Sequence, residues 1–375
     1  MAASSSSSEE SSSERELSSV LKADEKLLRS KDHSIAAALK DNFPMINGYL
    51  FPNRTSSYGT DTFKHIFEWV QDSSGDAYPM AVVTHRTAPR VVVYFHGNAE
   101  DVGDCVQRLH LYSEWLNSHV VAVEYPGYGI TKGRCTENIV VERALHAMRY
   151  VVRVFRVPLS KIIVFGRSIG TGVAAQISKQ CGDRLAGLIL QSPFESVKRL
   201  AAEHTWQSMF IPDKFDNVEA MSALKTLPVL IYHCANDRVI PFSHGQRVYD
   251  SCPCDKSTKL IVEDKWGDHM RFTKDHLKMF LETFVWDMNK RIERNGLPKL
   301  PPLALEVKGF QRLPPDAVSQ IMTLSKNALR PADDDSWVLK HDRHLMTAEE
   351  LEMESRTGDE QIAMIFMNIK KREQT

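Results

Sequence analysis

Residues 161–172 read KIIVFGRSIGTG, and this stretch organises the rest of the chain. It consists of a short apolar run, a pentapeptide of the form G-x-S-x-G centred on Ser168, and a continuation in small and apolar residues. In a nucleophile elbow the serine occupies a strained strand-to-helix turn, and Gly166 and Gly170 leave room where side chains would collide. The segment therefore predicts a buried strand, a sharp turn that exposes the Ser168 hydroxyl, and a helix. A glycine-rich turn with an incidental serine is the alternative.

Other segments repeat this alternation of strand and helix. Continuous apolar runs are typical of strands buried on both faces of a parallel sheet, and amphipathic patterns with a helical period separate them. Residues 63–70 and 80–84, which precede all of these runs, predict a hairpin at a sheet edge. The pattern predicts an α/β fold with a mostly parallel sheet and helices on both faces. The apolar runs lie at residues 90–95, 119–124, 161–165, 185–190, 228–233 and 259–262.

Composition divides the chain into four parts. Residues 1–13 are mostly Ser, Ala and Glu, which predicts a disordered tail because such residues bury too little surface to offset chain entropy. Residues 14–59 predict an N-terminal helical extension and linker, residues 60–298 the main α/β domain, and residues 299–375 a partly helical C-terminal extension. Residues 361–371 carry an apolar helical stripe. We expect this helix to dock onto the main domain; a membrane-surface or partner-binding helix is the alternative.

Charge and composition narrow the class of partner. The formal net charge is −1 at pH 7, which argues against nucleic acid as a partner.

No signal-peptide-like run is present, and no apolar segment reaches the ~20 residues needed to span a bilayer. The six cysteines are scattered, without the spacing of a metal site, and fit reduced thiols. We expect a cytoplasmic protein, either soluble or in peripheral contact with membranes. The sequence carries no signal of oligomeric state.

Three residues that could form a catalytic triad occur in the chain order serine, acid, histidine. Ser168, Asp237 and His269 each follow a predicted strand. The carboxyl ends of parallel strands meet at one edge of the sheet, where ligands bind in open α/β folds. A serine hydroxyl needs a base to accept its proton, and the base needs a group that fixes its tautomer. We therefore predict Ser168 as nucleophile, Asp237 as acid and His269 as base.

Each member of this set has an ordinary explanation and some have rivals. Asp237 could be a turn residue, and His269 could neighbour the cap of the following helix. Asp264 is a rival for the acid, and Asp268 is a rival for orienting His269. The remaining candidate histidines are expected to be structural because they lie within a strand or a helix start, or beyond the loop; they are His233, His244 and His276.

An oxyanion hole needs two backbone N–H donors beside the nucleophile. One is expected from Ile169, the residue after the nucleophile, and the other from the loop after an earlier strand. His96-Gly97-Asn98 supplies such a loop, and the N–H of Asn98 is the predicted second donor. A strand-ending turn without this role is the alternative. This chemistry needs neither a metal nor an organic cofactor.

The chain carries five motifs: HGNA at 96–99, YPGYG at 125–129, GRSIG at 166–170, DRVIPFSHG at 237–245 and GDH at 267–269. Together they resemble the α/β-hydrolase superfamily and, within it, the α/β-hydrolase domain-containing protein 17 family. The resemblance covers about residues 63–288. It implies that residues 60–298 form the catalytic domain of an acyl-protein thioesterase, which removes palmitate from protein cysteines. It also implies Ser168 as nucleophile, Asp237 as acid and His269 as base.

One departure from the family affects membrane attachment. Members of the family carry an N-terminal cluster of palmitoylated cysteines, whereas the first cysteine here is Cys105, inside the catalytic domain. Ala2 is not the glycine that myristoylation requires, and the chain ends in Gln374-Thr375 without a prenylation cysteine. A soluble hydrolase of another acyl ester therefore stays open as a function.

The substrate is predicted only as a class, an acylated protein or a lipid ester. Apolar residues between 193 and 228 could line an acyl groove, although such residues are more often core. The alternatives to a thioesterase are a lipid or small-molecule carboxylesterase or lipase, a serine peptidase, and a non-catalytic scaffold. The groove candidates are Trp206, Met209, Phe210, Ile211, Phe215 and Met221.

Overall fold

The structure is a computed structural model that describes most of the main domain and parts of both extensions. Two predicted features lie outside the described residues: the tail as far as residue 11 and the helix at residues 361–371. Among the groove candidates, Trp206, Met209, Phe210 and Ile211 lie outside as well. The described residues are 12–29, 50–51, 55–59, 66–71, 77–98, 100–203, 208, 212–256, 258–295, 300–303 and 345–346.

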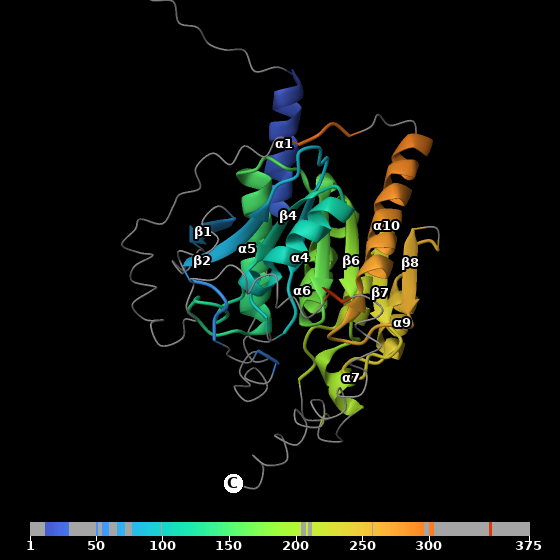
Figure 1. The fold of residues 1–375 in the computed structure, drawn as a ribbon. Coiled ribbons are helices and arrows are strands. Elements are labelled where there is room, and N and C mark those ends of the chain that lie inside the picture. Colours follow the sequence, from blue (N-terminus) through green and yellow to red (C-terminus); the bar gives the residue numbers. More distant parts are fainter. Residues whose placement is uncertain are drawn as a thin grey trace, which may run out of the picture.

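An eight-stranded sheet forms the centre of the molecule, with the strand order β1-β2-β4-β3-β5-β6-β7-β8 (Figure 1). β1 and β2 form an antiparallel hairpin and β2 is antiparallel to β4, whereas all later neighbours pair in parallel. The predicted edge hairpin and mostly parallel sheet are confirmed. The strands are β1 (Phe67–Gln71), β2 (Ala77–Val83), β3 (Val91–Phe95), β4 (His119–Val123), β5 (Ile162–Arg167), β6 (Gly187–Gln191), β7 (Val229–Cys234) and β8 (Lys259–Asp264).

Helices cover both faces of the sheet, as predicted. Alternate residues of β3 enter two separate apolar clusters: Val91 and Val93 pack on the side of α5 and α6, whereas Val92 and Tyr94 pack on the side of α4 and α10. Because both faces are buried, the strand is apolar throughout. The helices of these two layers are α4 (Val102–Trp115), α5 (Glu137–Arg153), α6 (Ile169–Cys181) and α10 (Lys274–Arg294).

Shorter elements complete the domain between these helices. Single-turn 3-10 helices precede β5 and β6, at Leu159–Lys161 and Gly182–Arg184. Three helices follow the last parallel strands: α7 (Val197–Ala202), α8 (Asn217–Ser222) and α9 (Phe242–Ser251). α8 and α9 pack next to one another on the side of α6. Within the described segments, no helix combines the length and the apolarity needed to cross a bilayer.

Helix α1 (Ser12–Leu27) belongs to the N-terminal extension and packs against α5. It begins two residues inside the segment predicted as a tail. Leu21 and Leu28 join the core cluster on the α5 side. The carboxylate of Asp24 is buried, accepts a hydrogen bond from the backbone N–H of Leu159 at 2.9 Å, and pairs with Arg184. Apolar and polar contacts together therefore fix this helix on the domain.

Part of the C-terminal extension also contacts the domain. The short strand β10 (Leu345–Met346) pairs in parallel with β9 (Phe272–Thr273), which immediately precedes α10. Closer to the domain, the N–H of Leu303 donates to the carbonyl oxygen of Ala88 at 2.7 Å. The extension is thus anchored at two places in the described residues.

The two described groove candidates belong to the core. Phe215 and Met221 have exposed fractions of 0%, and both lie in the cluster on the α5 and α6 side. A Cβ atom added to Gly172 of α6 would lie 2.6 Å from the Phe215 ring. These residues therefore fill space between α6 and the following segment, as the more common interpretation of such a run predicts.

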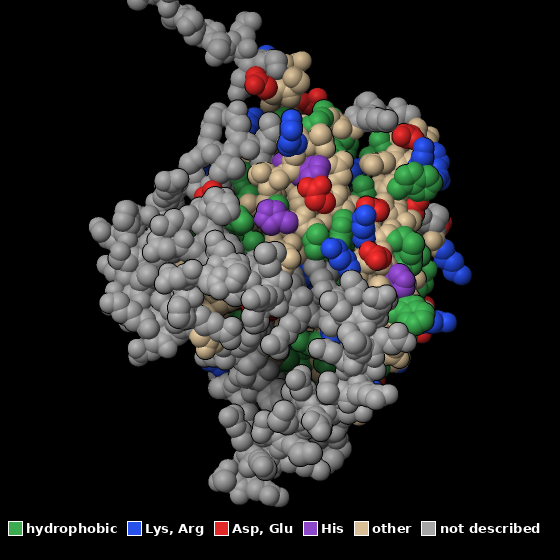
Figure 2. Space-filling view, viewed as in Figure 1, with side chains coloured by type: hydrophobic (Ala, Val, Ile, Leu, Met, Phe, Trp, Pro, Cys, Tyr) green, Lys and Arg blue, Asp and Glu red, His purple; other side chains and the backbone are tan. Residues whose placement is uncertain are grey.

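The surface around α10 mixes charges of both signs. In the view of Figure 2, Lys, Arg, Asp and Glu side chains of the described residues are interspersed with hydrophobic ones and do not gather by sign. The mixture agrees with the formal net charge of −1. The described part of this face therefore carries interspersed charges of both signs.

Candidate active site

The elbow at Ser168 is strained in the way that the sequence predicts. Ser168 follows β5 and precedes α6, with φ 51° and ψ −121°, a backbone conformation that residues other than glycine seldom adopt. A Cβ on Gly166 would lie 2.3 Å from the carbonyl oxygen of Gly170, and a Cβ on Gly170 would lie 2.2 Å from that of Phe95. Both glycines are therefore required for the close approach of strand, turn and helix.

The structure brings Ser168, His269 and Asp237 together in a continuous line. Ser168 Oγ lies 3.0 Å from His269 Nε2, and His269 Nδ1 lies 2.8 Å from Asp237 Oδ2. The three residues follow β5, β8 and β7, so all three lie at the carboxyl edge of the sheet. Each is buried, with exposed fractions of 8% for Ser168 and His269 and 4% for Asp237. The arrangement can move a proton from the hydroxyl to the imidazole while the carboxylate holds the opposite nitrogen.

The loop after β7 fixes the carboxylate of Asp237. The backbone N–H groups of Val239 and Ile240 donate to Asp237 Oδ1 at 3.0 and 2.7 Å, which leaves Oδ2 facing His269. Burial alone would raise the pKa of Asp237, but the charge of His269 and hydrogen bonds from His233 and His269 outweigh it and hold this pKa below its ordinary value. Asp237 therefore stays ionised and can orient the imidazole.

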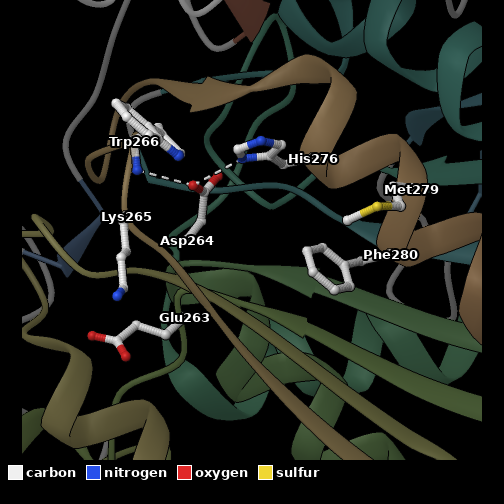
Figure 3. Close-up of a pocket in the computed structure, with 7 residues that line it drawn as sticks. All are labelled: Glu263, Asp264, Lys265, Trp266, His276, Met279 and Phe280. Carbon is white, nitrogen blue, oxygen red and sulfur yellow. Dashed lines mark hydrogen bonds and ion pairs between the residues drawn. The ribbon is translucent and has the colours of Figure 1, made fainter.

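The rival carboxylates are engaged elsewhere. Asp264 accepts hydrogen bonds from the hydroxyl of Tyr232 and, at 3.0 Å, from the backbone N–H of Trp266, and it lies 3.2 Å from His276 Nδ1. Figure 3 shows this side chain in a hollow between β8 and α10, turned toward His276 and Trp266. Asp268 instead forms an ion pair with Arg271 at 2.8 Å. The geometry therefore favours Asp237 as the partner of His269.

His233 is closer to the site than its position in a strand indicates. Its Nε2 lies 2.7 Å from the carbonyl oxygen of Ile240 and 3.5 Å from Asp237 Oδ2. The side chain is fully buried and supports the loop after β7 that carries Asp237. His244 contacts Glu195 and Glu203, at 3.3 and 3.1 Å, away from this line of residues.

The predicted oxyanion loop lies beside the nucleophile. A Cβ on Gly97 would lie 3.6 Å from Ser168 Cβ. Asn98 follows in the same loop, and its Oδ1 accepts a hydrogen bond from the Tyr128 hydroxyl at 2.8 Å. Ile169 is the first residue of α6, so its N–H is one of the four that have no intrahelical partner. Both predicted donors are near Ser168, and their role in binding an oxyanion stays a prediction.

The buried side chains of His96 and Glu124 support the oxyanion loop. His96 Nε2 lies 3.1 Å from Glu124 Oε1, and His96 Nδ1 lies 2.9 Å from the carbonyl oxygen of Gly97. The ring stacks on Tyr125 with centroids 3.9 Å apart. Both ring nitrogens face acceptors, which suits the doubly protonated imidazolium. Burial lowers the pKa of His96, but the hydrogen bond and charge of Glu124 outweigh it, so the pKa is raised.

A cluster of buried charges next to the elbow is not among the residues predicted from the sequence. Glu100 forms ion pairs with Arg108 at 2.5 Å and with Arg167 at 3.0 Å, and all three side chains are at most 3% exposed. The signal available in the sequence is Arg167 itself, a charged residue within an otherwise apolar and small strand-to-helix segment. Charges are rarely buried without a partner, so such a position predicts a carboxylate nearby.

Comparisons with known proteins find relatives that match about half of the chain. No family model matches the chain. It is 34% identical over 162 residues to the α/β hydrolase domain-containing protein aho-3 of Caenorhabditis elegans, covering 43% of this chain and 48% of that protein. It is 33% identical over 175 residues to α/β hydrolase domain-containing protein 17C of Homo sapiens, covering 45% and 51%. It is 30% identical over 211 residues to the lysophosphatidylserine lipase ABHD12 of Danio rerio, covering 51% of each.

The chain thus spans about half the length of the curated relatives it matches. Among solved structures, the esterase Pf2001 of Pyrococcus furiosus superposes with a TM-score of 0.49 at 12% identity, covering 64% of this chain and 98% of that one. The sheet order and the strained elbow agree with the fold that the sequence motifs predict. The chain thus has an α/β-hydrolase fold, and its sequence is similar to relatives named α/β hydrolase domain-containing protein 17C and aho-3.

Proposed function

We propose that this chain is a serine hydrolase that cleaves acyl esters and thioesters through an acyl-enzyme on Ser168, with palmitoylated proteins as its substrates. The observation that carries the proposal is the hydrogen-bonded line from Ser168 Oγ to His269 Nε2, 3.0 Å, and from His269 Nδ1 to Asp237 Oδ2, 2.8 Å. A serine hydroxyl is a weak nucleophile, and a base that is itself oriented by a carboxylate activates it.

The reaction proceeds in two halves. Ser168 Oγ attacks the acyl carbonyl carbon while its proton passes to His269 Nε2, and the N–H groups of Ile169 and Asn98 stabilise the resulting oxyanion. The C–S bond then breaks, His269 returns the proton to the leaving thiolate, and the acyl group stays on Ser168. Water attacks this acyl-enzyme with His269 as base, which releases the carboxylic acid and restores the serine. Asp237 holds Nδ1–H of the imidazole throughout.

Two observations support the substrate class. The resemblance to the domain-containing protein 17 family implies a thioesterase that acts on acylated cysteines, and the sequence similarity to protein 17C supports it.

A cytoplasmic setting is part of the proposal, because all six cysteines are unbridged and buried, as is usual for proteins in a reducing compartment. Contact with the membrane surface that carries such substrates is also part of it.

A lipid or small-molecule carboxylesterase or lipase is the second candidate. It is favoured by 30% identity over 211 residues to a protein named lysophosphatidylserine lipase. The same triad chemistry serves oxygen esters and thioesters, so substrate preference separates the two candidates and the triad does not.

The test measures labelling and turnover by the purified full chain. A fluorophosphonate probe should label the wild type and fail to label Ser168→Ala, and turnover of a palmitoyl-thioester peptide should disappear with it. Ser192→Ala is a matched control, because Ser192 also follows a strand with a positive φ, 51°. Preference for a long-chain thioester over monoacylglycerol and lysophosphatidylserine supports the first candidate. The reverse preference supports the second, and absence of labelling contradicts both.

A further inference from the structure

The side chain of Arg167 connects two loops that carry different parts of the candidate site. Its Nη1 donates to Glu100 Oε1 at 3.0 Å, next to the predicted oxyanion loop. Its Nη2 donates to the backbone carbonyl oxygen of His269 at 3.1 Å. The next residue along the chain is Ser168. One guanidinium thus joins the nucleophile strand, the segment after β3 and the loop that holds the base.

Glu100 continues this connection into the oxyanion loop. Its Oε1 accepts a hydrogen bond from the backbone N–H of Gly97 at 2.6 Å, in addition to the bond from Arg167. Its Oε2 accepts from Arg108 Nη2 at 2.5 Å. The carboxylate is therefore fixed on both oxygens, and the direction of the Gly97 amide is fixed with it.

The surrounding packing leaves these groups little room to move. Arg167 is 3% exposed, and a Cβ on Gly97 would lie 2.6 Å from Arg167 Nη1 and 2.8 Å from Glu100 Oε1. Glycine at position 97 is thus what lets the guanidinium and the carboxylate approach the loop backbone. Buried charge-assisted hydrogen bonds are short and directional, so they transmit position well.

We propose that Arg167 and Glu100 are positioning residues that set the distance between the oxyanion loop and His269. The inference rests on the proposed function, because it assigns the pair a part in the same site. Neither side chain is required to touch the substrate. The planar fork of arginine reaches the two acceptors at once, which the single ammonium of lysine cannot reproduce. Loss of the link would move the base relative to the oxyanion donors, and displacements of about 1 Å cost about 100-fold in rate.

The test compares three variants with a matched control. Arg167→Gln and Glu100→Gln remove the charge link, and Arg167→Lys keeps the charge without the fork. Arg108→Gln is the control, since Arg108 is as deeply buried and pairs with the other oxygen of the same carboxylate, whereas the hydrogen bond to the carbonyl oxygen of His269 comes from Arg167. Thermal unfolding of each variant separates loss of folding from loss of positioning.

For Arg167→Gln we expect kcat on an acyl ester to fall by about 100-fold with KM within about twofold. We expect a partial loss, about tenfold, for Arg167→Lys. Arg108→Gln should lose comparable thermal stability while its kcat falls less than that of Arg167→Gln. If Arg167→Gln, Glu100→Gln and Arg108→Gln lose activity only in proportion to their loss of stability, the pair has a purely structural role and the inference is wrong. The inference is also wrong if KM rises with kcat unchanged.

A second readout does not depend on turnover. The proton on His269 Nδ1, hydrogen-bonded to Asp237, should give a downfield nuclear magnetic resonance signal that is absent from His269→Gln. We expect Arg167→Gln to shift or broaden this signal and Arg108→Gln to leave it in place. An unchanged signal in Arg167→Gln overturns the inference even if the protein hydrolyses acyl esters. If the wild type hydrolyses none, the proposed function fails, and the signal still decides whether Arg167 positions His269.

Discussion

Ser168 Oγ lies 3.0 Å from His269 Nε2, although the two residues are 101 positions apart in the chain. The contact arises because β5 and β8 end at the same edge of the sheet, with β6 and β7 between them. Asp237 follows β7, so its loop lies next to the loop of His269. The order of the strands, set by helical crossovers on both faces, therefore delivers three distant side chains to one place.

The acid of the triad can be tested by comparing two carboxylates. Asp237→Asn should lower kcat/KM by about 10⁴-fold, because the amide no longer holds the imidazole in the required tautomer. Asp264→Asn should keep most of the activity, because Asp264 bonds to Tyr232 and His276 rather than to His269. Steady-state kinetics on a thioester, with thermal unfolding as a check on folding, measure both. An inactive Asp264→Asn beside an active Asp237→Asn would contradict the assignment.

Packing at the elbow predicts a large cost for one methyl group. Gly170→Ala places a Cβ 2.2 Å from the carbonyl oxygen of Phe95, a backbone atom that cannot move aside cheaply. We expect a loss of about 3 kcal/mol in the free energy of unfolding, the upper end of the range for overpacking. Urea unfolding monitored by tryptophan fluorescence measures it. Gly182→Ala is the contrast, since no heavy atom lies within 4 Å of its Cβ and only the positive φ of 60° opposes it.

Phe215 distinguishes a core residue from an acyl-groove residue. Its side chain is fully buried and contacts Phe51 in an edge-on arrangement, with ring centroids 6.3 Å apart. Phe215→Ala should lower the free energy of unfolding by about 3–5 kcal/mol, as expected for truncating a buried aromatic ring. Denaturant titration and a palmitoyl-thioester KM should be measured on the same preparation. A raised KM with unchanged stability would restore the groove interpretation.

The His96–Glu124 pair predicts how stability depends on pH. The pKa of His96 is raised in the folded state, so folding takes up a proton where the unfolded histidine, with an ordinary pKa of about 6.5, is neutral. The stabilising contribution is complete below about pH 6.5 and is lost as pH rises through the raised pKa, at up to about 1.4 kcal/mol per pH unit. Glu124→Gln should flatten this slope in urea titrations across pH 6 to 9. A wild-type stability that increases over the same window would have the wrong sign.

The sequence by itself determined the fold class and the members of the candidate triad. Periodic patterns decide strands and helices locally, and the G-x-S-x-G turn fixes where the nucleophile stands, because only glycine fits at positions 166 and 170. Ser168, Asp237 and His269 could be named because each follows a strand, and strand ends share an edge. These inferences need only residue order and the general geometry of parallel sheets.

The tertiary structure alone decided which groups meet across that edge. It separated Asp237, which bonds to His269, from Asp264, which bonds to His276. It also placed Phe215 in the core and joined Arg167 to Glu100 and to the carbonyl oxygen of His269. Such contacts depend on loop backbones and side-chain rotamers set by residues that are distant in sequence, and no local periodicity encodes them. A hydrogen bond forms only when the donor–acceptor distance is correct to within a few tenths of an ångström. A sequence pattern places a residue only on one face of a helix or strand, or at its end.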